Sequence, residues 1–327
     1  MNDNKYVQSQ ADVSTNGKTN AADKNKFVLV TGAYGGMGSS TVKTLVKNGF
    51  TVFALDKAVK TANKSTETVG EITQPAEIGE QNKTAKSDEP THSAYDTNTP
   101  DEESKIISIE TVVTDEQSVL NAFEKVKSVT QNLFAIVHFA GIYMLDSFIE
   151  IPADKMKLAF DVNVLGAYLI NKTFLPLLSA NSRIIITTSE LAPIDTLPFT
   201  GIYAVTKTAL DKYAFSLKME LQLLDIKVSV IRAGAVDTSM LGVSTTQLDK
   251  FCENTKLYSC NAKRFKNIVD KVEARKIPPQ KIADKTLKIL RKKNPKFAYS
   301  INRNPLLLFF NAMPQKFQFW VIKKILK

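Results

Sequence analysis

The feature that most constrains this chain is a glycine-rich stretch, Thr-Gly-Ala-Tyr-Gly-Gly-Met-Gly, at residues 31–38. The apolar run that precedes it, residues 27–30, predicts a buried strand. Residues 39–48 carry apolar side chains three and four positions apart and predict a helix that ends before Gly49, and residues 51–56 predict a second strand. A strand, a glycine loop, a helix and a strand in this order form a βαβ unit whose helix N-terminus can hold phosphate groups.

The same alternation continues through most of the chain. Further strands are expected at residues 105–113, 133–139, 183–188, 227–231 and 297–301, and helices at 116–129, 154–178, 203–224 and 279–292. Strands that alternate with helices predict one doubly wound parallel sheet of the Rossmann type, an α/β fold. Since right-handed crossovers bring the carboxyl ends of the strands to one edge, the ligand is expected there.

Composition separates a folded domain from three other parts. Residues 1–26 are polar and are expected to be disordered. Residues 57–104 contain only ten hydrophobic residues, one of them aromatic, and predict a flexible insertion. We therefore expect a single domain at residues 27–301, interrupted by this insertion, and a basic amphipathic segment at residues 302–327.

Composition also excludes several classes of protein. No apolar run approaches the roughly 18 residues of a membrane-spanning helix, and residues 1–26 lack the apolar core of a secretion signal, so a cytoplasmic location is expected. Cys252, Cys260, His92 and His138 do not have the spacing of zinc ligands, so no metal is expected. The basic end of the chain lacks a recognition fold for nucleic acid, so nucleic acid is not an expected partner.

Asp56 ends the second predicted strand, 18 residues after Gly38. A carboxylate at this place can accept hydrogen bonds from both ribose hydroxyls of a dinucleotide, and it repels a 2′-phosphate. The sequence therefore favours NAD over NADP, although the neighbouring Lys57 weakens the discrimination.

Tyr203 and Lys207 stand four residues apart at the start of a predicted helix and therefore share a face. A phenol with an ordinary pKa of about 10 is a poor base near neutrality, but an adjacent ammonium and a cationic nicotinamide both stabilise the phenolate. Tyr203 is therefore a candidate general acid or base. Ser189, at the carboxyl end of a predicted strand, offers a hydroxyl that can hold a substrate oxygen.

Together these residues resemble the short-chain dehydrogenase/reductase family, from about residue 27 to about residue 301. The residues that match its TGxxxGxG loop, helix asparagine, catalytic serine and YxxxK pair are Thr31, Gly32, Gly36, Gly38, Asn163, Ser189, Tyr203 and Lys207. Because Gly35 is also present, the loop alone equally fits the extended branch of sugar-nucleotide epimerases. The asparagine, the serine and the YxxxK pair favour the short-form branch, and residues 198–221 are similar to hydroxysteroid, retinol and 3-hydroxybutyrate dehydrogenases.

The resemblance implies a role for each of these side chains. Tyr203 would transfer the proton, and Lys207 would lower its pKa and bind ribose. Ser189 would orient the substrate carbonyl, and Asn163 would hold a relay water. Hydride would pass between nicotinamide and the carbinol carbon. The implied cofactor contacts are Gly32, Tyr34, Gly36, Met37, Gly38, Asp56, Val113, Ala140, Gly141, Tyr203, Lys207, Gly234, Val236 and Thr238.

The chain departs from the family pattern in three respects. His138 and Phe139 stand where the family has two asparagines after the fourth strand. Val112 stands where an acidic residue usually accepts from the adenine amino group, and Ala233 replaces a proline. These departures put the packing beside the cofactor and the strength of adenine binding in question, but none of them is a proton-transfer residue.

The branch likeness implies a lipophilic secondary alcohol or ketone as substrate, such as a steroid, a retinoid or a hydroxy acid. Residues 238–277 are expected to cover the pocket. Their apolar side chains could line it or pack in the core, namely Leu241, Val243, Leu248, Phe251 and Leu257. Two other functions stay open at this point: a non-catalytic dinucleotide sensor or scaffold, and a sugar-nucleotide epimerase, which would need a larger carboxyl-terminal domain.

The segment beyond residue 301 interleaves aromatic and aliphatic residues with lysines, as in Phe317-Gln-Phe-Trp-Val-Ile-Lys-Lys. This pattern suits a helix that lies in a membrane interface, and it equally suits a cap over the substrate pocket or a subunit contact. By resemblance, a homodimer or homotetramer is expected to form through the two long helices predicted at residues 154–178 and 203–224.

Overall fold

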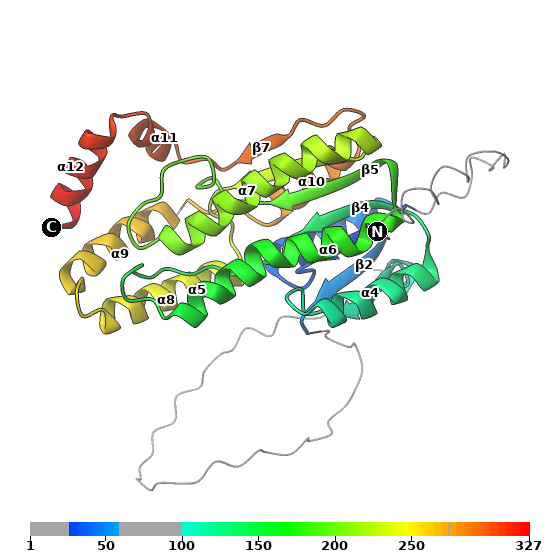
Figure 1. The fold of residues 1–327 in the computed structure, drawn as a ribbon, viewed down its shortest axis with the longest axis horizontal. Helices are drawn as coiled ribbons and strands as arrows, with labels where there is room; N and C mark the ends of the chain where they lie inside the picture. The colour runs from blue at the N-terminus through cyan, green and yellow to red at the C-terminus, as the bar shows by residue number, and fades with distance from the viewer. Residues whose placement is uncertain (1–25, 59–99, 274) are drawn as a thin grey trace, which may run out of the picture.

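The computed structural model describes residues 26–58, 100–273 and 275–327 (Figure 1). The disorder expected for residues 1–26 and the insertion expected at 57–104 therefore lie almost entirely outside the described residues. Within the described part, seven strands form one sheet in the order β3-β2-β1-β4-β5-β6-β7, and all neighbouring strands are parallel. The strands are β1 (Phe27–Thr31), β2 (Thr51–Asp56), β3 (Ile106–Glu110), β4 (Leu133–His138), β5 (Leu178–Thr187), β6 (Lys227–Ala233) and β7 (Ala298–Ile301). The expected doubly wound Rossmann-type sheet is confirmed.

The order of the strands places a crevice at one edge of the sheet. The chain runs outward from β1 through β2 to β3 and then returns to lay β4 on the other side of β1. Connections from β1 and from β4 therefore leave in opposite directions, and a doubly wound sheet binds its ligand at such a switch point, outside the carboxyl ends of the strands.

Two apolar cores hold helices against the two faces of the sheet (Figure 1). One face is covered by α4 (Glu116–Val129), α6 (Gly166–Phe174) and α7 (Gly201–Leu221), and the other by α2 (Gly36–Lys47) and α10 (Gln280–Leu290). Phe53 and Phe174, both fully buried, belong to the first core, and Leu45 and Ile282 to the second. The strands of this sheet are near-continuous hydrophobic runs because both of their faces are buried.

A third apolar cluster lies beyond the carboxyl edge. It joins α8 (Ser239–Asn254), α9 (Ser259–Glu273) and α12 (Gln315–Leu326), which lie with α11 (Pro305–Asn311) at one end of the molecule in Figure 1. Leu248 and Phe251 belong to this cluster and Leu257 is exposed. The side chains of Leu241 and Val243 lie outside those described. Of the two alternatives left open by the sequence, core packing therefore holds for Leu248 and Phe251, and neither these two residues nor Leu257 lines the pocket.

The helix expected at residues 154–178 is interrupted. It begins as α5 (Ala153–Phe160), passes through a π-helical turn at Asp161–Leu165, and continues as α6, which ends at Phe174, while Leu178 already starts β5. A π-helical turn inserts one residue and rotates the side chains within it, and such turns frequently mark functional sites. Here the turn contains Asn163.

No helix in the part of the chain that the structure describes is long and apolar enough to cross a membrane. The short helix α3 (Pro100–Glu103) leads into β3.

Candidate active site

The glycine loop between β1 and α2 is packed so closely that side chains would not fit. Gly32 has a φ of 64°, and a Cβ there would lie 2.6 Å from the backbone nitrogen of Ala140. A Cβ on Gly36 would lie 2.6 Å from Cγ2 of Thr238, and one on Gly38 would collide with the carbonyl of Gly32. The helix N-terminus behind this loop is capped by Gly35 without a side chain, and its first turn has no acidic residue. Backbone amides at a helix N-terminus whose first turn carries no acidic residue fit the pyrophosphate of a dinucleotide.

Asp56 ends β2 beside this loop. Its Oδ2 accepts a hydrogen bond from the backbone N–H of Tyr34 at 2.8 Å, and its Oδ1 accepts one from Lys57 at 2.8 Å. Oη of Tyr34 lies 2.5 Å from Oγ of Ser108 on β3, in a hydrogen bond. The carboxylate is therefore held at the tip of β2 by backbone donors, and ionised carboxylate oxygens can accept further bonds from a ribose.

The chain leaving β4 packs against the asparagine of the π-helical turn. Oδ1 of Asn163 accepts from the backbone N–H of Ile142 at 2.8 Å, and its Nδ2 donates to the carbonyl of Ile142 and to Oγ1 of Thr206, both at 3.0 Å. A Cβ on Gly141 would lie 3.1 Å from Oδ1 of Asn163 and 3.4 Å from Nζ of Lys207. The buried amide of Asn163 thus ties the segment after β4 to α7 and keeps it close to the lysine.

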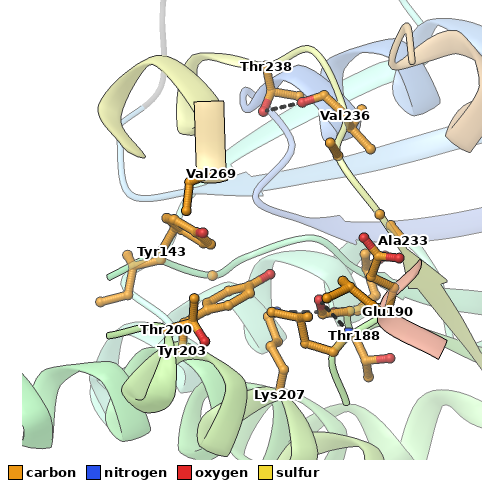
Figure 2. A pocket seen from close by; sticks show the side chains of 18 of the residues that line it. Tyr143, Thr188, Glu190, Thr200, Tyr203, Lys207, Ala233, Val236, Thr238 and Val269 are labelled. Carbon is orange, nitrogen blue, oxygen red and sulfur yellow. Dashed lines mark hydrogen bonds between the residues drawn. The ribbon is translucent and has the colours of Figure 1, made fainter. Parts of the chain in front are cut away.

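Tyr203, Ser189 and Lys207 meet at the carboxyl edge of the sheet. Ser189 follows β5, and the other two residues lie on the first turns of α7. Figure 2 shows Tyr203 and Lys207 at this edge, next to Thr188 and Glu190. Both Tyr203 and Ser189 line the pocket, and the side chain of Ser189 lies close enough to the phenol to lower its pKa. Nζ of Lys207 lies 5.8 Å from the centre of the Tyr203 ring and donates to the carbonyl of Thr187 at 3.2 Å. The four-residue spacing therefore brings the phenol of Tyr203 and the ammonium of Lys207 together on one face of α7. The hydroxyl of Ser189 joins them from the end of β5.

Burial sets the acidity of this pair. Desolvation raises the pKa of Tyr203 to about 12, although the side chain of Ser189 lowers it. Desolvation also lowers the pKa of Lys207 to about 8. The sequence predicts that Lys207 lowers the pKa of Tyr203. In the structure, the desolvation of the phenol raises this pKa by more than its neighbours lower it. A positive charge brought next to the phenol would act in the opposite direction from desolvation.

Glu190, the residue after Ser189, is a buried carboxyl group on the wall of the pocket. Its Oε2 accepts from the backbone N–H of Asn304 at 2.6 Å, and burial raises its pKa. A Cβ on Gly234 would lie 3.0 Å from its Oε1. Glu190 therefore links the end of β5 to the chain that follows β7. The pattern of the sequence did not single it out, although a carboxylate directly after an apolar strand was a signal to do so.

The segment after β6 lines the same pocket beside the glycine loop. The backbone N–H of Gly234 donates to the carbonyl of Ile301 at 2.9 Å, and Val236 is buried and forms an isolated parallel bridge with Ile277. Oγ1 of Thr238 donates to the carbonyl of Val236 at 3.4 Å, as Figure 2 shows. Thr238 thereby lies against Gly36, where the glycine loop and the β6 segment meet.

The pocket gathers about half of the predicted site residues. On its wall are Met37, Gly141, Ser189, Tyr203, Lys207, Gly234, Val236 and Thr238. The others lie outside it, on the glycine loop and on strand ends next to it or in the π-helical turn: Gly32, Tyr34, Gly36, Gly38, Asp56, Val113, Ala140 and Asn163. The methyl groups of Val113 pack on Gly166 of α6, where a Cβ would lie 2.8 Å away.

Most of the apolar lining was missed by the sequence reasoning. It comes from the chain after β4, the loop before α7, α9 and α11: Ile142, Tyr143, Leu191, Leu197, Phe265, Ile268, Val269 and Leu307. The ring of Tyr143 lies 4.4 Å from that of Tyr203, centre to centre (Figure 2). The apolar spacing of Phe265, Ile268 and Val269 within a basic stretch was the available signal for α9.

The departures from the family pattern have local explanations. Nε2 of His138 and Oδ1 of Asn171 lie 2.9 Å apart in a hydrogen bond, and Nδ2 of Asn171 donates to Oη of Tyr213 at 3.1 Å. Burial lowers the pKa of His138 to about 4, so the imidazole is neutral and holds α6 and α7 to β4. Val112 is exposed, and the carbonyl of Ala233 accepts from the backbone N–H of Glu190.

Comparison with known proteins agrees with this geometry. A family model described as short chain dehydrogenase matches residues 26–88 and 81–249. Among curated proteins, the chain is 31% identical to the uncharacterized oxidoreductase YbbO of Escherichia coli (57% of this chain, 65% of that protein). It is 29% identical to estradiol 17-beta-dehydrogenase 2 of Mus musculus (66% and 50%) and 21% identical to 3-ketodihydrosphingosine reductase of Bacteroides thetaiotaomicron (87% and 90%). The aligned part spans less than two thirds of the first two relatives.

Solved structures share the fold. A short-chain dehydrogenase from Streptomyces avermitilis superimposes with a TM-score of 0.62 at 17% identity, over 85% of this chain and 88% of that one. An alcohol dehydrogenase from Thermococcus sibiricus in complex with 5-hydroxy-NADP has a TM-score of 0.57 at 17% identity (84% and 95%). A 3-ketoacyl-(acyl-carrier-protein) reductase from Brucella melitensis in complex with NADH has a TM-score of 0.58 at 16% identity (84% and 96%). At these identities the likeness concerns the fold alone.

Proposed function

This chain belongs to the short-chain dehydrogenase family, and we propose that it is an NAD(H)-dependent oxidoreductase that interconverts a lipophilic secondary alcohol and the corresponding ketone. The observation that carries the proposal is the meeting of Tyr203, Ser189 and Lys207 at the mouth of the dinucleotide crevice. A dinucleotide bound on the glycine loop would supply or accept the hydride.

The proposed mechanism assigns the proton to Tyr203. Its phenol and the hydroxyl of Ser189 would both hydrogen-bond the substrate oxygen, which places that oxygen within reach of the phenolic proton. In the direction of reduction Tyr203 donates the proton to the oxygen as the carbonyl becomes an alcohol. Lys207 stabilises the phenolate that remains, and Asn163 keeps the segment after β4 in place beside Lys207. The proposal that Asn163 also holds a relay water follows from the family resemblance.

The choice of NAD rests on Asp56. Both of its oxygens are held by backbone N–H groups at the tip of β2, so the carboxylate is fixed where the ribose hydroxyls of the adenosine would lie. A phosphate in the same place would meet a negative charge. Relatives of similar fold bind either cofactor, so the preference is tested directly by comparing the two.

The proposed substrate class rests on the lining of the pocket. Apart from the catalytic group and Glu190, the wall facing Tyr203 is largely aliphatic and aromatic, with Phe265, Val269 and Leu307 on its outer side. The names of two relatives refer to estradiol and to 3-ketodihydrosphingosine, which are both lipophilic. A wall of this kind favours a substrate with little polar surface beyond its reacting oxygen.

The experiment that tests this proposal follows the absorbance of reduced nicotinamide with purified protein. Steroid, retinoid and short hydroxy-acid alcohols and their ketones are offered with NAD and NADP in parallel. We expect turnover with a lipophilic member of the panel and a preference for NAD. No turnover with any member of the panel would overturn the substrate class, and a preference for NADP would overturn the assignment of Asp56.

We also propose that the enzyme works in the cytoplasm as a homodimer or homotetramer. Large apolar side chains are exposed on α7, on α6 and on the π-helical turn that precedes α6. They are Leu165, Tyr168, Phe215 and Met219. A second copy of the same surface would cover them. Sedimentation velocity of the wild type and of Met219→Glu tests this assembly, which a monomeric wild type would contradict.

A further inference from the structure

The two C-terminal helices expose an unusual amount of apolar surface. On α11 Leu306 and Phe309 are exposed, and on α12 so are Phe317, Phe319, Trp320 and Ile325. Phe319 is 71% exposed and Trp320 59%. The ring centres of Phe317 and Trp320 lie 5.6 Å apart, so these two exposed rings lie side by side on α12. A cluster of exposed aromatic residues of this kind marks a binding surface.

Positive charge surrounds this apolar surface. Residues 302–327 contain five lysines and arginines and no acidic residue. On α12, Lys316, Lys323 and Lys324 stand four residues before, three after and four after Trp320, which places them around it on the outward side of the helix. Within the described ranges none of these three lysines forms an ion pair with a carboxylate.

The two helices are attached to the rim of the substrate pocket. Leu307 of α11 lines the pocket, and the backbone N–H of Asn304, at the start of α11, donates to the buried Glu190. Oδ1 of Asn311, at the end of α11, accepts from the backbone N–H of Asp195 at 2.7 Å. The carbonyl of Leu326, at the end of α12, accepts from Nδ2 of Asn261 on α9 at 2.6 Å. Whatever the exposed face binds is therefore held next to the pocket.

We propose that α11 and α12 dock the enzyme on the surface of an anionic lipid bilayer, with the substrate pocket next to that surface. Aromatic side chains flanked by lysines match the interface of a bilayer, where rings lie at the level of the headgroups and ammonium groups meet lipid phosphates and carboxylates. A second copy of the chain is a poorer occupant, because a symmetric contact through this face would bring two uniformly positive surfaces together.

Docking in this way would let a substrate enter the pocket from the bilayer. This step rests on the proposed function. The pocket wall and the docking face adjoin each other: Leu307 of α11 lines the pocket and precedes the exposed Phe309 by two residues, and Ile268 of α9, the helix that holds α12, lines the pocket and is 40% exposed. A lipophilic alcohol or ketone dissolved in the bilayer would then reach Tyr203 along apolar surface. Docking itself can be measured without any substrate.

The chain contains a single tryptophan, Trp320, at the centre of the proposed contact. Its fluorescence therefore reports on docking in the full chain without a label. We expect vesicles that mix phosphatidylcholine with phosphatidylserine to shift the emission to shorter wavelength and to sediment the protein. Brominated lipid should quench the emission, and high salt should reverse the binding. Vesicles of phosphatidylcholine alone should bind more weakly.

Variants separate the contribution of the lysines to lipid binding from that of the apolar side chains. The triple change Lys316→Gln, Lys323→Gln and Lys324→Gln should weaken binding to the anionic vesicles by roughly 100-fold. Phe319→Glu should also weaken sedimentation. Leu223→Glu is the matched control, because Leu223 is 82% exposed just before β6, at the opposite edge of the sheet, and should bind as the wild type does.

Three results would overturn the proposal. The first is an unchanged emission and no sedimentation with anionic vesicles. The second is a blue shift that appears on raising the protein concentration without lipid, which would assign the face to a second copy. The third is binding that Phe319→Glu and Leu223→Glu leave equally intact, which would place the lipid contact elsewhere. Because none of these readouts depends on turnover, an inactive substrate panel would not be mistaken for a failure to dock.

Discussion

The cofactor side of the pocket and its substrate wall are held in place by different forces. On the cofactor side, backbone hydrogen bonds continue past the strand ends: the N–H of Phe139 donates to Thr31 at 3.0 Å, and that of Thr188 to Ile231 at 2.9 Å. The substrate wall consists of helices held by side chains. The ring of Phe199 lies 4.9 Å from that of Phe251 and 5.4 Å from that of Phe265, centre to centre.

This difference separates chemistry from specificity. A parallel sheet fixes its strand ends in register, and the proposed proton-transfer group is tied to one of them, since Ser189 follows β5 and Lys207 of α7 donates to the carbonyl of Thr187 at the end of β5. Apolar packing between helices has no comparable register, and it tolerates changes of side-chain volume at modest cost. The substrate wall can therefore change its lining without disturbing Tyr203, Ser189 and Lys207.

Removing the phenolic hydroxyl should have the largest effect. Tyr203→Phe should lower kcat/KM by about 10²–10⁴, because it removes the proton donor and leaves the cofactor side intact. Binding of NADH, followed by its fluorescence, should be unchanged. Tyr143→Phe is the matched control, since it retains the ring that packs on Tyr203, and it should stay within a few-fold of the wild type. Equal losses in the two variants would show that the hydroxyl of Tyr203 has no special role.

Asp56→Ala should change the choice of cofactor. Losing a charged hydrogen-bond acceptor for ribose should lower kcat/KM with NAD by roughly 10- to 100-fold, and kcat/KM with NADP should rise because the repulsion is gone. Steady-state kinetics with both cofactors measure the ratio. Asp115→Ala, which removes the N-terminal cap of α4, should reduce stability and leave the ratio unchanged. A ratio that Asp56→Ala does not alter would sink the assignment.

His138 should make the stability of the fold depend on pH. Its pKa is lowered by burial from 6.5 to about 4, so between these values the unfolded chain binds a proton that the folded chain does not. Stability is therefore fully present above pH 6.5 and is lost as the pH falls toward 4. From pH 7 to pH 5 this group should cost about 2 kcal/mol of unfolding free energy. Urea titrations of the wild type and His138→Gln, which keeps an amide for Asn171, should diverge by that amount, and parallel losses would contradict the prediction.

Narrowing the substrate wall should have the smallest effect. Val269→Trp places a large ring on α9 opposite Tyr143 and should raise KM for a bulky substrate by roughly 10-fold, with kcat for a small alcohol unchanged. Val129→Trp, at the exposed end of α4, is the control of equal size. A fall in kcat for the small alcohol would mean that the substrate wall and the proposed catalytic group do not act independently.

The residues foreseen from the sequence are those whose role is local. The loop from Gly32 to Gly38 joins a strand to a helix within a few residues, and Tyr203 and Lys207 share one helix face by spacing alone. Asn163 was expected within an unbroken helix; the π-helical turn that aims it at Ile142 depends on packing that no local pattern records. Glu190 was missed for a similar reason, because its partner Asn304 is 114 residues away.

The sequence by itself determined the parallel sheet, its glycine loop and the pairing of Tyr203 with Lys207, because periodicity, glycine spacing and helix geometry act over short stretches of chain. Tertiary structure alone decided the acidity of Tyr203 and Lys207, since desolvation depends on everything that packs around them. It also decided that Phe265 and Leu307, far from Tyr203 in the chain, form the wall opposite it. Burial and long-range contact belong to the folded molecule, and no window of sequence contains them.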